Sequence, residues 1–200
     1  VVPDCEMGAN GTFVFADSGL EQNPDPEKLA AIAISSAESF EALVGDGLVT
    51  QAKSHALMMM TADCLPVVLG NADGSEVANL HAGWRGLANG IVENTIATMQ
   101  TKPTWAWLGA AIGQPCFEIG AEVKDAFCSK YPALESAFLA GKVEGKFYAD
   151  LYAIARYILN QHGIETVLGG NQCSYTQADE YFSYRREAKT GRMTTFVFIR

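Results

Sequence analysis

The sequence predicts a single layered domain of the α/β or α+β class. The chain has 200 residues and a mass of 21.5 kDa, which suits one domain over residues 1–200 better than two. Apolar residues make up 48% and charged residues 18%, so a substantial core can form. Short apolar runs and segments of helical periodicity interleave without a strict βαβ rhythm, which favours a layered fold with a mixed sheet.

Each expected element rests on a local pattern. Continuous or alternating apolar runs predict strands at residues 12–15, 56–60, 65–69, 76–80, 105–108 and 195–199. Helices are expected at 27–43, 87–99, 121–130 and 151–161. The first of these would begin with Asp25 as its N-cap and Pro26 at its first helical position. Residues 1–45 carry the weakest signals, and we expect them to be a divergent or incomplete part of the same domain.

Charge and cysteine content exclude several classes of protein. The formal net charge of −9 argues against nonspecific binding to nucleic acid and against docking on anionic membranes. No apolar run approaches the roughly 20 residues that span a bilayer, and the first residues lack the pattern of a signal peptide. The five cysteines, at positions 5, 64, 116, 128 and 173, are widely spaced and form no CxxC pair. We therefore expect a cytoplasmic protein without a disulfide framework.

The residues with the clearest chemical potential lie in two short segments, Thr61–Pro66 (TADCLP) and His81–Gly86 (HAGWRG). Cys64 lies between two predicted strands, and His81 ends the next one. A thiolate and an imidazole that meet can bind a metal such as zinc or act as a Cys–His nucleophile pair. They can equally be inert core residues, because free cysteine is often buried. Composition and spacing leave all three readings open.

The residues that follow His81 predict a place for an anion. Gly83 and Gly86 leave backbone N–H groups accessible at the start of a helix, and Arg85 adds a guanidinium that pairs with phosphate or carboxylate. The alternative is a tight glycine turn with a solvated arginine.

Other candidate residues have bland alternatives that we favour. His55 could be a third metal ligand, but a polar residue at a strand edge is the better interpretation. His162 is expected at a helix end, and Cys116 as a small buried hydrophobe in the loop 112–120. The aromatic and basic residues at 181–186 could stack on a planar ring, although strand packing plus surface charge explains them as well.

Taken together, these motifs resemble the bacterial YfiH-like family, also called the polyphenol-oxidase or laccase-domain family, some of whose members are described as purine nucleoside phosphorylases. The resemblance runs from about residue 45 to the C-terminus and is carried by segments 61–66, 81–86, 112–120, 182–186 and 190–192. It implies an α/β/α fold and a zinc site of one Cys and two His. Cys64 matches the cysteine ligand and His81 one histidine ligand. The other histidine belongs to a Gln-x-His-Gly motif, and no such string precedes Cys64.

The resemblance implies a zinc-dependent enzyme that acts on purine nucleosides and phosphate. The reaction would be phosphorolysis of adenosine-, inosine- or guanosine-type substrates, with adenosine deamination as a related activity. In this interpretation Cys64, His81 and Asp63 are catalytic residues, and Asp63 supports the metal or acts as a base. Arg85 and Gly86 bind substrate.

Three alternatives stay open beside this interpretation. A copper-dependent polyphenol oxidase is ranked lower, because the three histidines of this sequence cannot build a multi-copper cluster. A hydrolase or editing factor for cell-wall precursors would use Cys64 as nucleophile and His81 as its base. The domain could also be an inactive binding module.

Overall fold

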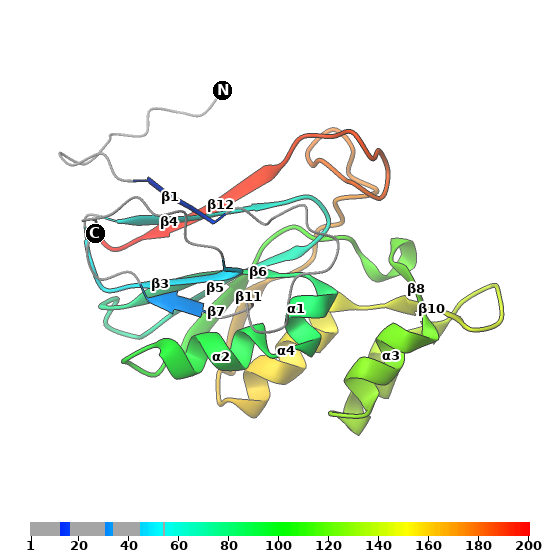
Figure 1. Ribbon diagram of the computed structural model, residues 1–200, viewed down its shortest axis with the longest axis horizontal. Helices are drawn as coiled ribbons and strands as arrows, with labels where there is room; N and C mark the ends of the chain where they lie inside the picture. Colours follow the sequence, from blue (N-terminus) through cyan, green and yellow to red (C-terminus); the bar gives the residue numbers. More distant parts are fainter. Residues whose placement is uncertain (1–12, 17–30, 34–44, 54) are drawn as a thin grey trace.

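The computed structural model describes residues 13–16, 31–33, 45–53 and 55–200 (Figure 1). A six-stranded sheet forms its centre. The strands are β2 (Ala31–Ala33), β3 (Gly47–Thr50), β5 (Leu65–Gly70), β6 (Val77–Ala82), β7 (Trp105–Leu108) and β11 (Thr166–Gly169). Their order in the sheet is β11-β7-β5-β6-β3-β2. The outer pairs β11–β7 and β2–β3 are parallel and the inner pairs are antiparallel, so the sheet is mixed, as predicted.

A three-stranded sheet packs on one face of the central sheet (Figure 1). It consists of β1 (Phe13–Ala16), β4 (Ala56–Thr61) and β12 (Met193–Phe198), in the order β1-β4-β12. The buried Asn79 of β6 joins the two sheets, because its side-chain amide donates to Leu57 O at 3.1 Å and to Thr195 O at 2.8 Å. A small apolar cluster that includes Leu48 and Met59 fills the space around this link.

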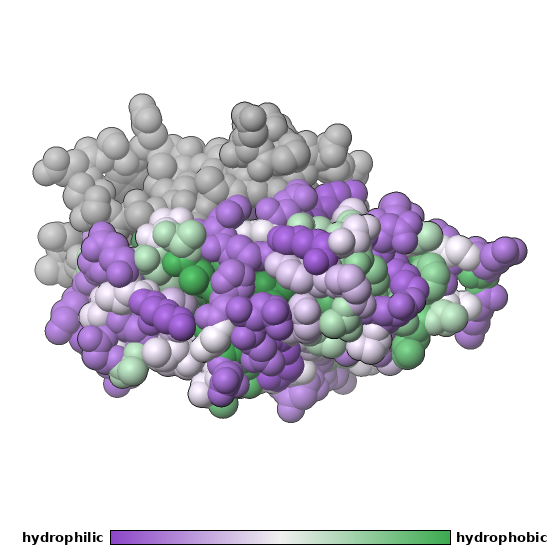
Figure 2. Space-filling view, turned by 90° about the horizontal axis from the view of Figure 1, so that it is seen from below, coloured by the Kyte–Doolittle hydropathy of each residue, from purple (hydrophilic) through white to green (hydrophobic). Residues whose placement is uncertain are grey.

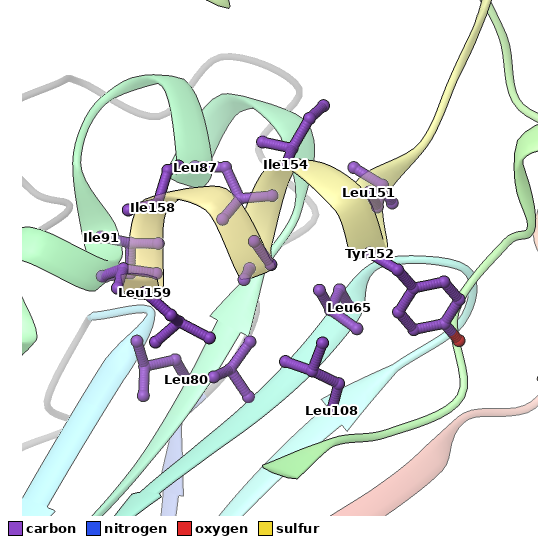
Figure 3. Close-up of a cluster of buried hydrophobic side chains, with 14 of the residues drawn as sticks. Leu65, Leu80, Leu87, Ile91, Leu108, Leu151, Tyr152, Ile154, Ile158 and Leu159 are labelled. Atoms are coloured by element: carbon purple, nitrogen blue, oxygen red, sulfur yellow. The ribbon is translucent and has the colours of Figure 1, made fainter. Parts of the chain in front are cut away.

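Helices cover the other face of the central sheet. They are α1 (Trp84–Ala88), α2 (Ile91–Thr98) and α4 (Leu151–Gln161). Figure 3 shows how leucines of β5, β6 and β7 meet the apolar side chains of these helices. The helix α4 begins at Asp150, whose carboxylate accepts a hydrogen bond from Ala153 N at 2.9 Å. This N-cap and the apolar face explain why the segment forms a helix.

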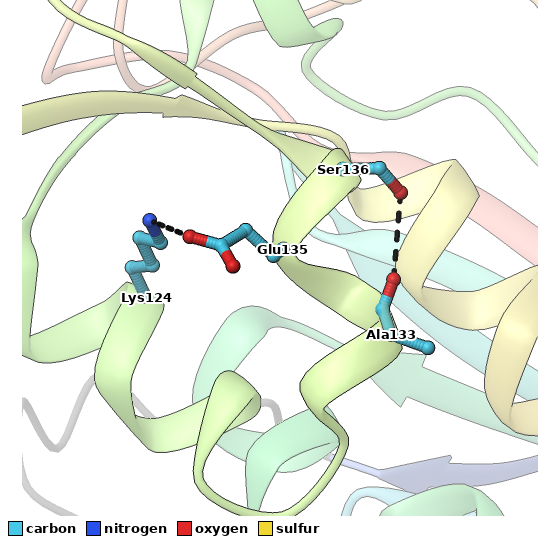
Figure 4. A network of polar contacts seen from close by, with 4 residues as sticks. All are labelled: Lys124, Ala133, Glu135 and Ser136. Carbon is cyan, nitrogen blue, oxygen red and sulfur yellow. Dashed lines mark hydrogen bonds and ion pairs between the residues drawn. The ribbon is translucent and has the colours of Figure 1, made fainter.

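A smaller unit lies at one end of the molecule and belongs to the same core. It contains β8 (Glu118–Gly120), β9 (Phe138–Ala140), β10 (Lys146–Ala149), α3 (Ala121–Cys128) and the 3₁₀ segments η2 (Gln114–Cys116) and η3 (Pro132–Ala137). The strand order is β8-β10-β9. An ion pair of 2.9 Å between Lys124 and Glu135 links α3 to η3, where Ser136 Oγ also donates to Ala133 O at 3.4 Å (Figure 4).

Most predicted elements are confirmed, and three differ. The helix expected over 87–99 is divided into α1 and α2, because Gly90 adopts a left-handed conformation with φ +88°. The helix expected over 27–43 contains the strand β2, while its remaining residues and its N-cap signal Asp25–Pro26 lie outside the described residues. The segment 181–186 forms turns rather than a strand.

The helix-covered side of the molecule presents a largely hydrophilic surface (Figure 2). Hydrophilic residues predominate on the face shown in Figure 2, which is the face seen from the side of the helices. Among the described residues, no helix has the length and apolarity that crossing a bilayer requires.

Candidate functional site

The structure brings Cys64 and His81 together at the end of two paired strands. Cys64 immediately precedes β5, and His81 is the penultimate residue of β6. The antiparallel register pairs Pro66 with His81, so the thiol and the imidazole leave the same end of the sheet. Cys64 Sγ and His81 Nε2 both lie within 4 Å of the position that a Cβ atom of Gly83 would take, and the two side chains interact. The predicted meeting of a sulfur and an imidazole from separate strands is therefore found.

A third residue, Asp46, completes this group and was not predicted. His81 Nδ1 lies 2.9 Å from Asp46 Oδ1, and the backbone N–H of His81 donates to Asp46 O at 2.7 Å. Since Nδ1 faces the carboxylate, Nε2 is the ring nitrogen that faces Cys64. Asp46 immediately precedes β3, and β3 pairs with β6. The glycines on both sides of Asp46 mark a turn, but no local pattern shows which strand lies beside it.

The electrostatics of this group favour a positively charged imidazole. Burial lowers the pKa of His81, but its interactions with Cys64 and its hydrogen bond to Asp46 outweigh burial and raise this pKa to about 10. A chain of carboxylate, imidazole and sulfur can move a proton or hold a thiolate, and the same donors can bind a cation.

Gly83 keeps this site open. A Cβ atom at position 83 would lie 3.0 Å from Cys64 Sγ and 3.9 Å from His81 Nε2. A side chain there would enter the space that both reactive groups face. Gly83 is also the N-cap of α1, and its backbone is extended there. The glycine of the HAGWRG segment is thus required by a close approach rather than by backbone conformation.

Arg85 and Gly86 differ in what they offer a ligand. Arg85 is exposed, and its guanidinium stacks over the Trp84 ring at 4.6 Å. Gly86 is buried, and a Cβ there would lie 3.4 Å from His81 O, so it serves close packing. The expected help from a helix N-terminus is weak, because α1 has five residues and a helix dipole needs several turns to develop. Positive potential at this end of the sheet therefore comes from charged side chains rather than from the helix.

Asp63 holds the turn that presents Cys64. It is nine-tenths buried and has φ +85°, a rare left-handed conformation for a residue other than glycine. Its carboxylate accepts hydrogen bonds of 2.6 Å from Ser174 Oγ and from Arg185 N. Because both oxygens are occupied by the C-terminal loop, the geometry favours a positioning role over that of a base.

The C-terminal loop owes its shape to Arg186, which sequence reasoning treated as a stacking or surface residue. Its guanidinium donates to three backbone carbonyls, those of Ser174, Tyr175 and Tyr181, at 2.6–2.8 Å. The neighbouring Arg185 donates to Glu118 O and lies over the Phe117 ring at 5.5 Å. The pair of arginines therefore fastens the loop that holds Asp63.

The described side chains around Cys64 offer too few ligands for a zinc ion. Cys64 and His81 supply two ligands, and the described ranges hold no group of three or more side chains that could bind a metal. His55 precedes β4 while Cys64 follows its end, so six residues of strand separate them by about 20 Å. His162 ends α4, as expected. A tight zinc site has at least three protein ligands, so these residues do not fit a complete one.

The structure also has a pocket of about 410 Å³ beside the same turn. Its lining includes Thr61, Pro66, Trp107, Glu180 and Tyr181. Cys64 and His81 are not among its lining residues, although Thr61 and Pro66 flank the turn that carries Cys64.

Comparison with known proteins places the chain in a family. The family model described as "Multi-copper polyphenol oxidoreductase laccase" matches residues 27–200. A Shigella flexneri protein named "Purine nucleoside phosphorylase YfiH" is 46% identical over 143 residues, which are 70% of this chain and 58% of that protein. A Haemophilus influenzae protein named "Purine nucleoside phosphorylase" is 37% identical over 195 residues, 95% of this chain and 80% of that protein.

A solved structure supports the same relationship. The crystal structure of a Neisseria meningitidis protein superimposes with a TM-score of 0.78 at 44% identity, covering 85% of this chain and 71% of that one. The chain spans 58% of the Shigella flexneri relative's length, so it represents part of what that protein contains. From these matches and from the arrangement around Cys64 and His81, the chain belongs to the YfiH-type family of laccase-like domains.

Proposed function

We propose that this chain processes purine nucleosides, and that the site formed by Cys64, His81 and Asp46 is where it does so. The observation that carries the proposal is the interaction between Cys64 and His81 in a chain that is 37–46% identical to proteins named purine nucleoside phosphorylase. Phosphorolysis is the main reaction that we propose, and hydrolytic deamination of adenosine is an additional one. Because the donor set does not fit a complete zinc site, no step is derived through a metal.

The residues of this chain would divide the phosphorolysis among them. An oxygen of phosphate attacks C1′ of the ribose, the bond from C1′ to the purine breaks, and the purine takes a proton. Arg85 would hold the phosphate by charge. His81, oriented by Asp46, would face the leaving purine as its proton donor. Asp63 would keep the Cys64 turn in place through its two hydrogen bonds.

The direct test is an assay of the full chain with inosine and phosphate, read out as hypoxanthine released. Cys64 raises the pKa of His81, so Cys64→Ala weakens the proposed proton donor and is expected to reduce release about tenfold or more. Cys128→Ala is the matched control, because Cys128 is also half-buried but lies on α3, and this variant should retain activity. Parallel assays with added zinc, with a chelator and with adenosine identify metal dependence and deamination. The proposal would be removed if inosine released no hypoxanthine in any arm and adenosine gave neither adenine nor inosine.

A second candidate function is favoured by the order of the three side chains. Asp46 orients His81, and His81 faces the Cys64 thiol, which is the arrangement of a nucleophilic cysteine with its base. Such a site cleaves amides or esters, as an editing factor for cell-wall precursors would. Alkylation of Cys64 distinguishes the two: protection by zinc supports metal binding, and rapid alkylation unaffected by a chelator supports the nucleophile.

Copper-dependent oxidation of phenols is ranked below both. Multi-copper clusters that reduce dioxygen need many histidine ligands, and this sequence has three histidines in total. Elemental analysis of the purified chain checks this ranking, since copper at one or more equivalents per chain would reverse it.

A further inference from the structure

Two cysteines that the proposed function does not use lie side by side near the Cys64 turn. Cys116 ends η2, and Cys173 follows β11 in the loop that leads to Arg185. A bridge between Ala111 and Cys173 brings the two segments together, and Ser174 N donates to Ala111 O at 2.9 Å. Cys116 N donates to Gly113 O at 3.0 Å while Gly113 N donates to the Cys173 sulfur at 3.2 Å, so the turn that carries Cys116 contacts Cys173, and the two sulfur groups interact. Both are free and half-buried.

The Cys173 sulfur lies in a cradle of hydrogen-bond donors. Gly113 N donates to it at 3.2 Å, and the hydroxyl and N–H of Thr176 and the N–H of Tyr175 also bond to it. Several backbone N–H groups that converge on one atom stabilise a negative charge. Burial raises the pKa of Cys173, but these hydrogen bonds outweigh it and lower this pKa below its usual range.

Cys116 has the opposite environment. Burial and the neighbouring Cys173 raise the pKa of its thiol, and Asp63 adds to the effect. The pair therefore joins a sulfur prepared to be a thiolate with a thiol that keeps its proton. This is the asymmetry of a sensing cysteine and a resolving cysteine. Cys128 provides a contrast within the chain, because burial raises the pKa of its thiol.

We propose that Cys116 and Cys173 are a reversible redox pair that a hydroperoxide converts into a disulfide. The Cys173 thiolate attacks one oxygen of hydrogen peroxide, the O–O bond breaks, and hydroxide leaves, so that the sulfur becomes a sulfenic acid. The Cys116 sulfur then attacks Cys173 Sγ and releases its proton, and the sulfenic oxygen leaves as water. Two electrons pass from the two sulfurs to the peroxide, and a small-molecule dithiol reverses the reaction.

The disulfide would act on the segments around the proposed site. Cys116 belongs to the loop that follows β7, and Cys173 adjoins Ser174, which bonds to Asp63. A covalent link between these two segments would fix the loop that holds the Cys64 turn. Oxidation is thus expected to change the mobility around Cys64 without consuming its thiol.

The full chain decides the proposal by peptide mapping after treatment with hydrogen peroxide. Every cysteine falls in its own tryptic peptide, with Cys116 in residues 86–124 and Cys173 in residues 157–185. The expected product is these two peptides joined, lighter than their sum by two hydrogen atoms, and separated again by dithiothreitol. Peroxide-treated chain in which the two peptides remain unlinked, or in which either is joined mainly to another cysteine peptide, would overturn the proposal.

Variants test the assigned roles. In Cys116→Ser the crosslink is lost and Cys173 accumulates as a sulfenic acid that dimedone traps. Cys128→Ser is the matched control and leaves the crosslink unchanged. Thr176→Val removes one hydroxyl donor and should slow oxidation of Cys173 about fivefold. If Cys128 and Cys173 react with peroxide at equal rates in the folded chain, the cradle has no effect and the assignment of Cys173 as the sensing sulfur is wrong.

Discussion

At the scale of single residues, Tyr152 links the segments that follow β7 and β11. Its hydroxyl accepts from Ala111 N at 2.8 Å and can donate to Gln172 O at 2.8 Å or Gly109 O at 3.0 Å. Tyr152→Phe leaves these backbone groups without a partner, so the free energy of unfolding should fall by about 1–3 kcal/mol in urea titrations. An unchanged unfolding midpoint would show that the hydroxyl contributes nothing.

The same tyrosine makes a pH prediction. Burial raises the pKa of Tyr152 to about 12, well above the ordinary tyrosine value of 10.0, although the hydrogen bond with Ala111 opposes the shift. Because the folded state holds this proton more tightly, the stabilisation is complete below pH 10 and is lost as the pH rises toward 12. The stability difference between the chain and Tyr152→Phe, measured by urea unfolding, should therefore shrink between pH 9 and pH 11.

Asp46 makes a prediction about the site. Asp46→Ala removes the partner of His81 Nδ1, so the imidazole loses its fixed orientation, and activity on nucleosides should fall at least tenfold. Asp73→Asn, at an exposed turn, is the matched control. Equal activities of the two variants would count against the role of Asp46.

Residue chemistry was predictable where it was local. The TADCLP and HAGWRG segments marked Cys64 and His81 because reactive side chains and glycines gather there. Asp46 could not be found, since its contact with His81 depends on the pairing of β3 with β6 across distant sequence. The cradle around Cys173 depends likewise on Gly113, which is far away in the chain.

At the scale of elements, Glu93 of α2 binds the end of α3. Its Oε1 lies 2.8 Å from Lys130 Nζ and accepts from Tyr131 OH at 2.8 Å. Burial opposes ionisation, but these partners lower the pKa of Glu93, so its contribution is present above about pH 4.5 and is lost as the pH falls through the folded value. Glu93→Gln should cost about 1–2 kcal/mol at pH 7 and less at pH 3, by thermal unfolding.

A second ion pair serves as the control for Glu93. Glu135 pairs with Lys124 at a similar distance of 2.9 Å, but the side chain of Glu135 is 75% exposed. Glu135→Gln should therefore change stability by less than about 1 kcal/mol. A cost for Glu135→Gln equal to that for Glu93→Gln would contradict the argument from burial.

Element types were easier to predict than their limits. The strand at Trp105–Leu108 and the helix α4 follow the expected ranges, because apolar pattern and capping agree there. The single helix expected over 87–99 failed at Gly90, whose left-handed backbone begins a new helix in another direction. Its apolar spacing continues across the break, since α1 and α2 cover the same sheet, and periodicity alone cannot reveal a change of axis.

At the scale of the whole molecule, two apolar clusters share the central sheet as a common wall. The larger lies under the helices and the smaller between the sheets, and strands such as β6 contribute to both. We therefore expect residues 45–200 to unfold as one cooperative unit. Tryptophan fluorescence and far-ultraviolet circular dichroism should give coincident urea transitions. Two separated transitions would show that the smaller unit around α3 unfolds independently.

Gly83 leaves space at the end of the sheet, because it has no side-chain atoms beside the Cys64 sulfur and the His81 imidazole. At position 83 even one methyl group would stand 3.0 Å from the sulfur, in the path of anything that approaches both groups. Access to this point is thus limited by the backbone of residue 83 itself. A ligand that contacts both groups must fit past this backbone. Its width at this point therefore limits binding before its charge or its hydrogen-bonding groups do.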